Sequence, residues 1–281
     1  MLGAILGDIA GSRFERHPLP KDASPWDFPL LAASCRPTDD TVMTLAVAHA
    51  IRQCSGSLAE AEFTAALIDA MHDFGSRCPD AGYGWTFKKW LAERRREPYN
   101  SFGNGSAMRV SPAGWAWDTL EETQRGAALT ASVTHSHPLG IAGACATASA
   151  IFLARTGASM AEIKDCLAKD FHYDFSRTLA EIQPAYRFDV TCQGSVPEAL
   201  TAFFESTSCE EAIRCAIWLG GDSDTQAAIA GSCAQAMFGM PKDLQEKALG
   251  FLNDWQREEV RLWQEWLAGR KSAGKGAAAG A

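Results

Sequence analysis

The sequence lacks any Cys-x-x-Cys pair, although it contains nine cysteines among its 281 residues. Their number is odd, their positions are scattered, and several lie in apolar helical contexts such as residues 144–146. A disulfide framework needs paired cysteines and a structural zinc site commonly needs closely spaced ones, so the pattern argues against both. It is typical of small buried side chains in a reducing compartment, and we expect the protein in the cytoplasm.

Long apolar runs and an excess of basic residues are also missing. No run of about 18 uncharged apolar residues occurs, and the N-terminal segment reaches Asp8 without the basic stretch of a signal peptide. The sequence therefore predicts neither a transmembrane helix nor a membrane partner. The formal net charge of −8 argues against nucleic acid as a partner, because general nucleic-acid binders normally present a basic face.

Amphipathic helix is the dominant pattern, and strand patterns are weak throughout. Apolar residues recur at helical spacing over residues 41–53, 58–74, 140–156, 160–169, 180–186, 196–205, 210–219 and 224–238. The Ser-x-x-Glu sequence at residues 208–211 has the form of a capping box, and no linker divides the chain. We therefore predict one all-α domain over residues 1–270, a monomer, and a tail over residues 271–281 that is disordered or was added in cloning.

Two aspartate clusters, far apart in the chain, are the sharpest functional feature. Residues 38–41 read Thr-Asp-Asp-Thr and residues 220–225 read Gly-Gly-Asp-Ser-Asp-Thr, and each cluster precedes an apolar, alanine-rich helical segment. Aspartate is a good N-cap, so two capped helices are one explanation. A cap needs only one carboxylate, however, and extra like charges at a helix start are costly unless a cation is bound. Four carboxylates would balance two divalent cations, and hard oxygen ligands favour magnesium, manganese or calcium over zinc. Residue types alone leave both explanations open.

Other segments also carry candidate residues, each with a structural alternative. Residues 100–109 form a loop rich in glycine and asparagine that could hold phosphate with backbone N–H groups, although such a loop is more often a turn. His135 and His137 could bind a transition metal, but no third ligand lies nearby, which favours a capping or substrate-contacting histidine. Glycines at positions 3, 7 and 11 suit a tightly packed helix, and Glu15 at its end could be a surface charge. Aromatic residues from Tyr83 to Trp90 could stack on a ligand ring or pack in the core.

Taken in order, these segments resemble the ADP-ribosylglycohydrolase family, which includes the dinitrogenase reductase-activating glycohydrolase and the ADP-ribosyl-arginine and ADP-ribosyl-serine hydrolases. The matching segments are residues 7–15, 38–41, 103–109, 134–135 and 221–225. Any one of them is a weak motif, whereas five in the order of the family are specific. The resemblance implies a compact, single-domain all-α fold with a dinuclear centre of two Mg²⁺ or Mn²⁺ ions.

The resemblance also implies roles for individual residues. By position, the metal ligands of the family correspond to Thr38, Asp39, Asp40, Asp222, Asp224 and Thr225. The catalytic candidates are Asp39, Asp224 and Glu15, the last matching a glutamate that lies beside the metals in serine-type members. The residues that correspond to substrate-binding positions are Gly84, Ser101, Phe102, Gly103, Asn104, Gly105 and His135. Phe102 stands where some relatives have tyrosine, and His135 stands where a histidine contacts the adenosine side.

The implied activity is release of ADP-ribose from mono-ADP-ribosylated protein side chains by a metal-dependent hydrolase. Arginine is the preferred acceptor, because bacterial members of the family commonly act on it. Alternatives are ADP-ribosyl-serine, small-molecule or nucleic-acid conjugates of ADP-ribose, and a non-catalytic ADP-ribose-binding protein. The chemistry agrees with hydrolysis, because two hard cations can chelate a ribose diol and a nearby carboxylate can stabilise oxocarbenium-like charge.

Overall fold

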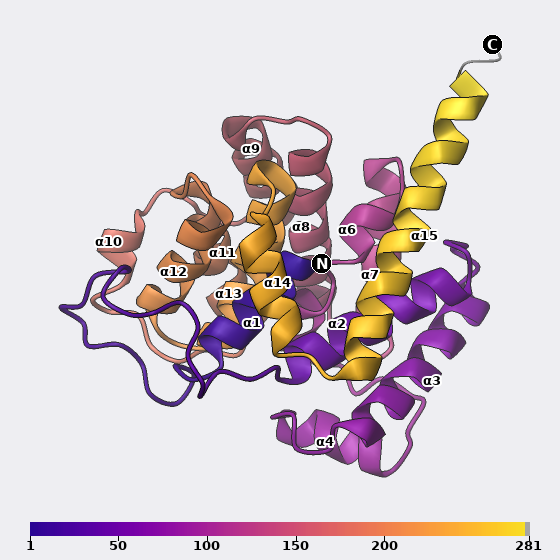
Figure 1. Ribbon diagram of the computed structural model, residues 1–281, viewed down its shortest axis with the longest axis horizontal. Helices are drawn as coiled ribbons and strands as arrows, with labels where there is room; N and C mark the ends of the chain where they lie inside the picture. Colours follow the sequence, from indigo (N-terminus) through magenta and orange to yellow (C-terminus); the bar gives the residue numbers. More distant parts are fainter. Residues whose placement is uncertain (279–281) are drawn as a thin grey trace.

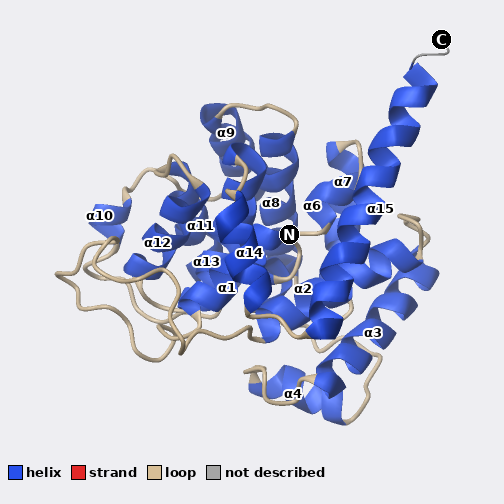
Figure 2. Ribbon diagram, in the orientation of Figure 1, coloured by secondary structure: helices blue, strands red, loops and turns tan. Residues whose placement is uncertain are grey.

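The computed structural model describes the backbone of residues 1–278 and the side chains of residues 1–270, and its described elements are all helices (Figures 1 and 2). The helices are α1 (Leu2–Gly11), α2 (Asp39–Gln53), α3 (Glu60–Arg77), α4 (Trp85–Ala92), α5 (Gly105–Met108), α6 (Ala113–Ala116), α7 (Leu120–Ser132), α8 (Pro138–Arg155), α9 (Met160–Phe171), α10 (Leu179–Ile182), α11 (Cys192–Phe204), α12 (Cys209–Leu219), α13 (Ser223–Phe238), α14 (Lys242–Gly250) and α15 (Asp254–Ala278). Within the described chain, an isolated bridge between Gly103 and Thr191 is the only β-type pairing. The all-α prediction is confirmed. The predicted tail over residues 271–281 overlaps the end of α15, its side chains are not described and residues 279–281 lie outside the described residues, so it stays a prediction.

Each segment with helical spacing contains a helix, but some boundaries differ from the prediction. The segment 180–186 was predicted too long, because α10 ends at Ile182. Pro184 follows two residues later, and a proline both restricts the residue before it and cannot continue a helix. Helix α7 is not among the predicted segments, although Thr119 caps it by accepting a hydrogen bond from the N–H of Glu122 at 3.1 Å. This Thr-x-x-Glu pattern is the helix-start motif that could have revealed α7.

The hydrophobic core consists of two adjoining clusters, and α1 contributes to both. One cluster lies mainly among α2, α3 and α7, and the other among α8, α11, α12 and α13. Ile5 belongs to the first cluster and Leu6 to the second, because successive residues of a helix point in different directions. The centre of α1 is therefore held between the two halves of the core.

The glycines of α1 allow it to approach α13 closely. A Cβ atom added at Gly3, Gly7 or Gly11 would overlap backbone atoms of α13. The three glycines lie four residues apart and therefore share one face of the helix, which confirms the predicted tight packing. In Figure 1 the first helix of the chain accordingly lies against a helix that begins more than 200 residues later. This contact places Asp8, in the middle of α1, near the start of α13.

One described helix, α8, is long and apolar enough to cross a membrane by length and composition, with a mean hydropathy of 1.4. Within the fold, however, 67% of this helix is buried. It packs against α7, α11 and α13, as a core helix of a globular protein does. The nine cysteines are free thiols, and six of them are buried, several in these same core helices.

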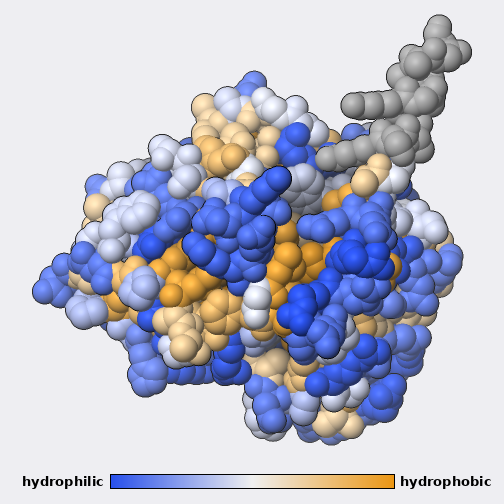
Figure 3. Space-filling view, in the orientation of Figure 1, coloured by the Kyte–Doolittle hydropathy of each residue, from blue (hydrophilic) through white to orange (hydrophobic). Residues whose placement is uncertain are grey.

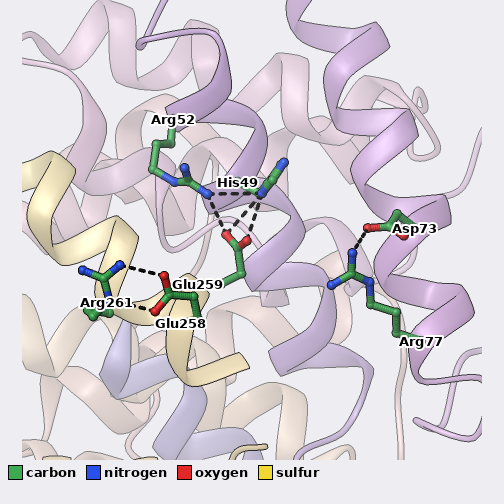
Figure 4. A network of polar contacts seen from close by, with 7 residues as sticks. All are labelled: His49, Arg52, Asp73, Arg77, Glu258, Glu259 and Arg261. Carbon is green, nitrogen blue, oxygen red and sulfur yellow. Dashed lines mark hydrogen bonds and ion pairs between the residues drawn. The ribbon is translucent and has the colours of Figure 1, made fainter. Parts of the chain in front are cut away.

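The C-terminal helix α15 is attached to α2 by an ionic contact as well as by apolar packing. Glu259 accepts a hydrogen bond from Arg52 at 2.9 Å and lies 3.2 Å from His49 Nδ1 (Figure 4). Its side chain is only 13% exposed, so solvent screens this contact less than it screens the surface pairs drawn beside it. On the face of the molecule in Figure 3, hydrophilic side chains surround a smaller apolar area.

Candidate active site

The two aspartate clusters meet in the folded chain. Carboxylate oxygens of Asp8, Asp40 and Asp224 all lie within 4.8 Å of one another, and all three residues are buried. The Thr225 hydroxyl donates to Asp40 Oδ2 at 3.4 Å, which joins the start of α13 directly to the start of α2. Segments separated by about two thirds of the chain thus form one acidic site at the junction of α1, α2 and α13.

Asp8 belongs to this site, and the sequence analysis assigned it no role. It accepts hydrogen bonds from the N–H of Thr38 at 2.9 Å, the hydroxyl of Thr38 at 2.6 Å and the N–H of Thr41 at 3.0 Å. The Thr41 hydroxyl also donates to it. Asp8 therefore caps α2 from a different helix. A charged residue inside the otherwise apolar stretch of residues 1–10 was the pattern that could have revealed it, because a buried charge needs partners.

Plain helix capping does not account for the remaining carboxylates. Thr38 and Asp8 already bond to the first N–H groups of α2, whereas Asp222 makes no side-chain cap at the start of α13. Asp222 Oδ2 instead accepts a hydrogen bond from Asn104 at 2.8 Å. Asp40 Oδ1 is buried and has no hydrogen-bond partner among the described residues. An orphaned carboxylate oxygen in an acidic cluster is the arrangement expected of a cation ligand.

The electrostatics of the cluster also favour a cation. Burial, followed by the charge of Asp224, raises the pKa of Asp40 well above its usual range, and burial with the charge of Asp222 does the same for Asp224. Burial and the charge of Asp8 raise the pKa of Asp39 to about 8, and burial raises that of Asp222 to about 6. Holding these groups ionised in the fold costs free energy unless a positive charge is bound. With only oxygen donors, the site fits hard divalent cations such as Mg²⁺ or Mn²⁺.

A cavity of about 350 Å³ opens above the cluster. Thirteen of the fourteen residues to which the sequence analysis assigned site roles line it: Glu15, Thr38, Asp39, Asp40, Gly84, Ser101, Gly103, Asn104, Gly105, His135, Asp222, Asp224 and Thr225. The exception is Phe102, whose side chain is 44% exposed and whose ring lies 5.3 Å from that of His137. The fold thus brings together segments from both ends and the middle of the chain, although their individual roles stay predictions.

Two further residues of the cavity belong to segments noted in the sequence, although neither was assigned a site role of its own. Trp85 is 77% exposed at the start of α4 and lines the cavity beside Gly84. Arg109 also lines it, yet its side chain is almost completely buried. Glu15 forms an ion pair of 2.9 Å with Arg16, and its charge contributes to the raised pKa of Asp222. Glu15 therefore lies near the acidic cluster and is not an isolated surface charge.

The fold and the site define an all-α protein with an oxygen-rich acidic centre beneath an open cavity. The family model described as ADP-ribosylglycohydrolase matches residues 1–278. The chain belongs to this family, which confirms the resemblance inferred from its motifs, and it is a hydrolase of glycosidic bonds.

Relatives with curated names support the same assignment. The chain is 29% identical over 328 residues to the ADP-ribosylhydrolase ARH3 of Mus musculus, with 89% of this chain and 86% of the relative covered. It is 26% identical over 298 residues to the ADP-ribosylarginine hydrolase Tri1 of Pseudomonas putida (strain GB-1), with 94% and 76% covered. A solved structure named "ADP-ribosylglycohydrolase-related protein complex" has the same fold, with a TM-score of 0.69, 21% identity and coverage of 95% and 96%.

Proposed function

We propose that this protein is a divalent-cation-dependent hydrolase that releases ADP-ribose from mono-ADP-ribosylated protein side chains, with arginine as the preferred acceptor. The observation that carries the proposal is the group of three buried carboxylates within 4.8 Å of one another beneath a cavity. Such a group is stable as a set of anions only with bound positive charge. A cavity above a cation site is also where a ligand with phosphates and ribose hydroxyls would be held.

The residues that would hold two Mg²⁺ or Mn²⁺ ions are Thr38, Asp39, Asp40, Asp222, Asp224 and Thr225. When bound, such ions supply Lewis acidity toward ribose hydroxyls and water. Asp8 has a different role in this proposal, because its oxygens already accept four hydrogen bonds from Thr38 and Thr41. It orients the start of α2 and so keeps Asp40 directed at the cluster.

We assign Glu15 the catalytic role at the glycosidic bond that is cleaved. Its side chain is 26% exposed and lines the cavity. Cleavage at the anomeric carbon develops oxocarbenium-like positive charge, which a nearby carboxylate stabilises. In its protonated form the same group can give its proton to the leaving atom, and in its ionised form it can take a proton from the attacking water. Arg16 pairs with Glu15 and restricts its orientation. The carboxamide of Asn104, bonded to Asp222, holds the glycine-rich loop against the acidic cluster.

Two features support arginine as the acceptor. The Pseudomonas putida relative, which covers 94% of this chain, is named for ADP-ribosylarginine. In addition, the exposed indole of Trp85 lies at the cavity of this acidic site. A guanidinium group stacks well on an indole face and is attracted by carboxylates. Lys89 Nζ already lies 5.7 Å from the centre of this ring, so the indole accepts a cation within the fold itself.

The experiment measures free ADP-ribose released from peptides modified on arginine or on serine, and from a small-molecule ester of ADP-ribose, with Mg²⁺ or Mn²⁺. We expect release from the arginine peptide to be fastest, to stop on chelation, and to be lost in Asp39→Ala and Asp224→Asn. Asp243→Asn, which changes an exposed residue of α14, is the matched control and should retain activity. Full activity of Asp39→Ala would contradict the mechanism. Faster release from serine would change the acceptor only, and tight binding without turnover would favour a non-catalytic binding protein.

A further inference from the structure

A buried arginine without an ionic partner lies beside the cavity. Arg109 is 1% exposed, and it makes no ion pair with a described residue. Its NH2 donates to the Thr130 carbonyl at 3.0 Å and to the Thr134 hydroxyl at 2.7 Å. Burying a guanidinium without a carboxylate is costly. Among the described residues, these hydrogen bonds hold the guanidinium in place, and one of them is made to the side chain of Thr134.

Thr134 links Arg109 to His135. Its hydroxyl is fully buried and lies 2.8 Å from His135 Nδ1. An arginine can only donate, so the Thr134 oxygen accepts from Arg109 and its single proton is left for another acceptor. His135 Nδ1 lies at hydrogen-bonding distance, and the Tyr99 hydroxyl also approaches the Thr134 side chain. A phenol can donate its own proton to the Thr134 oxygen, whereas a neutral imidazole that accepts at Nδ1 carries its proton on Nε2. Burial, and then the charge of Arg109, lower the pKa of His135 well below its usual range, which agrees with a neutral ring.

The other nitrogen of His135 faces the glycine-rich loop. A Cβ atom at Gly105 would lie 3.2 Å from Nε2, and one at Gly103 would lie 3.5 Å from it. The absence of side chains at these two positions leaves Nε2 accessible from the cavity, which His135 and both glycines line. A neutral N–H at this place can donate to a ligand oxygen without adding a second positive charge beside Arg109.

We propose that Arg109 and Thr134 are positioning residues that fix His135 as a neutral Nε2–H donor, directed at an oxygen of ADP-ribose in the cavity. The ligand named here rests on the proposed function. The positioning itself rests on the hydrogen-bonded series Arg109, Thr134, His135 and on the open approach to Nε2 past Gly103 and Gly105.

The first test observes the tautomer directly. Long-range ¹⁵N–¹H spectra of the full chain with labelled histidine, recorded at pH 7, report which nitrogen of each ring is protonated, and His135→Phe assigns the signals. We expect His135 as a single neutral tautomer with its proton on Nε2, and a mixture of tautomers in Thr134→Val. A proton on Nδ1, which would mean that the Thr134 proton goes elsewhere, or a doubly protonated ring would overturn the proposal.

The second test measures ADP-ribose affinity by calorimetry with Mg²⁺. We expect His135→Phe and Thr134→Val each to weaken binding about fivefold to tenfold, as for one lost hydrogen bond, and the double variant to be no weaker than His135→Phe alone. Thr134→Ser, which keeps the hydroxyl, should bind within twofold of the unmodified protein. Thr130→Val removes a neighbouring buried hydroxyl whose one hydrogen bond to a described residue is donated to the Ala127 carbonyl, and it should also leave affinity unchanged.

The outcomes separate this proposal from the proposed function. Equal losses in Thr134→Ser and Thr134→Val, or additive losses in the double variant, would mean that Thr134 acts through packing and would overturn the positioning role. An unmodified protein that does not bind ADP-ribose would overturn the proposed function, and with it the ligand of the Nε2–H donor. In that case the spectra would still decide whether Thr134, which Arg109 holds as a hydrogen-bond donor, fixes the tautomer.

Discussion

Asp40→Asn is expected to stabilise the metal-free protein, although it removes a charged side chain from a helix start. Asp40 is one of three buried carboxylates whose oxygens lie within 4.8 Å of one another, and one of its oxygens has no partner among the described residues. Its remaining contacts are long, with the hydroxyls of Thr38 and Thr225 each 3.4 Å from Oδ2. Asparagine keeps an oxygen for these contacts and removes the charge.

The magnitude follows from the separation of the charges. With an effective dielectric constant of about 20, two unit charges 4.8 Å apart repel each other by about 3.5 kcal/mol. Protonation relieves part of this repulsion, so we expect a gain of about 2 kcal/mol at pH 8, or about 4–8 °C in Tm for a chain of this size. If Asp40 served only as a helix cap, its removal would instead cost about 1 kcal/mol.

The pH dependence of stability is a second measurement of the repulsion among the clustered aspartates. The folded state raises the pKa of the clustered aspartates, that of Asp39 to about 8, so between pH 4 and pH 8 it binds more protons than the unfolded state. The stability of the metal-free protein should therefore fall as the pH rises through this window. The fall in stability with pH should be shallower in Asp40→Asn. Loss of the Asp40 charge lowers the repulsion that raises the pKa of the neighbouring aspartates.

The assay is thermal and urea unfolding with a chelator at pH 5 and pH 8, then with Mg²⁺ or Mn²⁺. Unmodified protein should gain stability on adding the cation, because a ligand of the folded state shifts the unfolding equilibrium, and Asp40→Asn should gain less. Asp243→Asn is the control of opposite sign, since this exposed acid pairs with Lys247 at 3.1 Å. An Asp40→Asn protein that is less stable than the unmodified one at pH 8 without metal would refute the reasoning.

Three further predictions concern catalysis, packing and the C-terminal helix. Glu15→Gln should lower the rate of ADP-ribose release about 100-fold or more while ADP-ribose affinity in calorimetry stays within a few-fold; an unchanged rate would remove Glu15 from the mechanism. Gly7→Ala should destabilise the fold by about 3 kcal/mol in urea unfolding, because its Cβ would overlap the Ala227 carbonyl. Its control, Gly250→Ala, meets no atom within 4 Å and should change stability by less than about 1 kcal/mol. Glu259→Gln should cost about 1 kcal/mol at pH 7. Burial alone would raise the pKa of Glu259, but its basic partners on α2 outweigh burial and lower that pKa, so the cost should shrink as the pH falls below 4.5. A cost that does not change with pH would show that the ionic contact contributes nothing.

Much of the fold could be predicted because helices are encoded locally. The 3.6-residue spacing of apolar side chains located eight helical segments, and the caps placed several of their ends. The errors were also local. The segment 180–186 was extended past Pro184, and the Thr-x-x-Glu start of α7 at Thr119 was overlooked.

The site was predictable only in part, because its members are close in space and distant in sequence. The motifs marked both aspartate clusters and the glycine-rich loop, and these residues do line one cavity. Asp8 was missed because its importance comes from hydrogen bonds to residues 30 and 33 positions away. Phe102 was grouped with its loop neighbours, yet its ring lies against His137 and is half exposed.

By itself, the amino-acid sequence determined the helical class, the family and the acidic motifs, since each depends on residue types at short, regular spacings. The tertiary structure alone decided that Asp8, Asp40 and Asp224 converge and that Thr134 connects Arg109 to His135. The first contact depends on how closely α1 packs against α13, and the second on where the residues that follow α7 lie beside the cavity. Packing of that kind is set by side-chain volumes throughout the core, which no local spacing specifies.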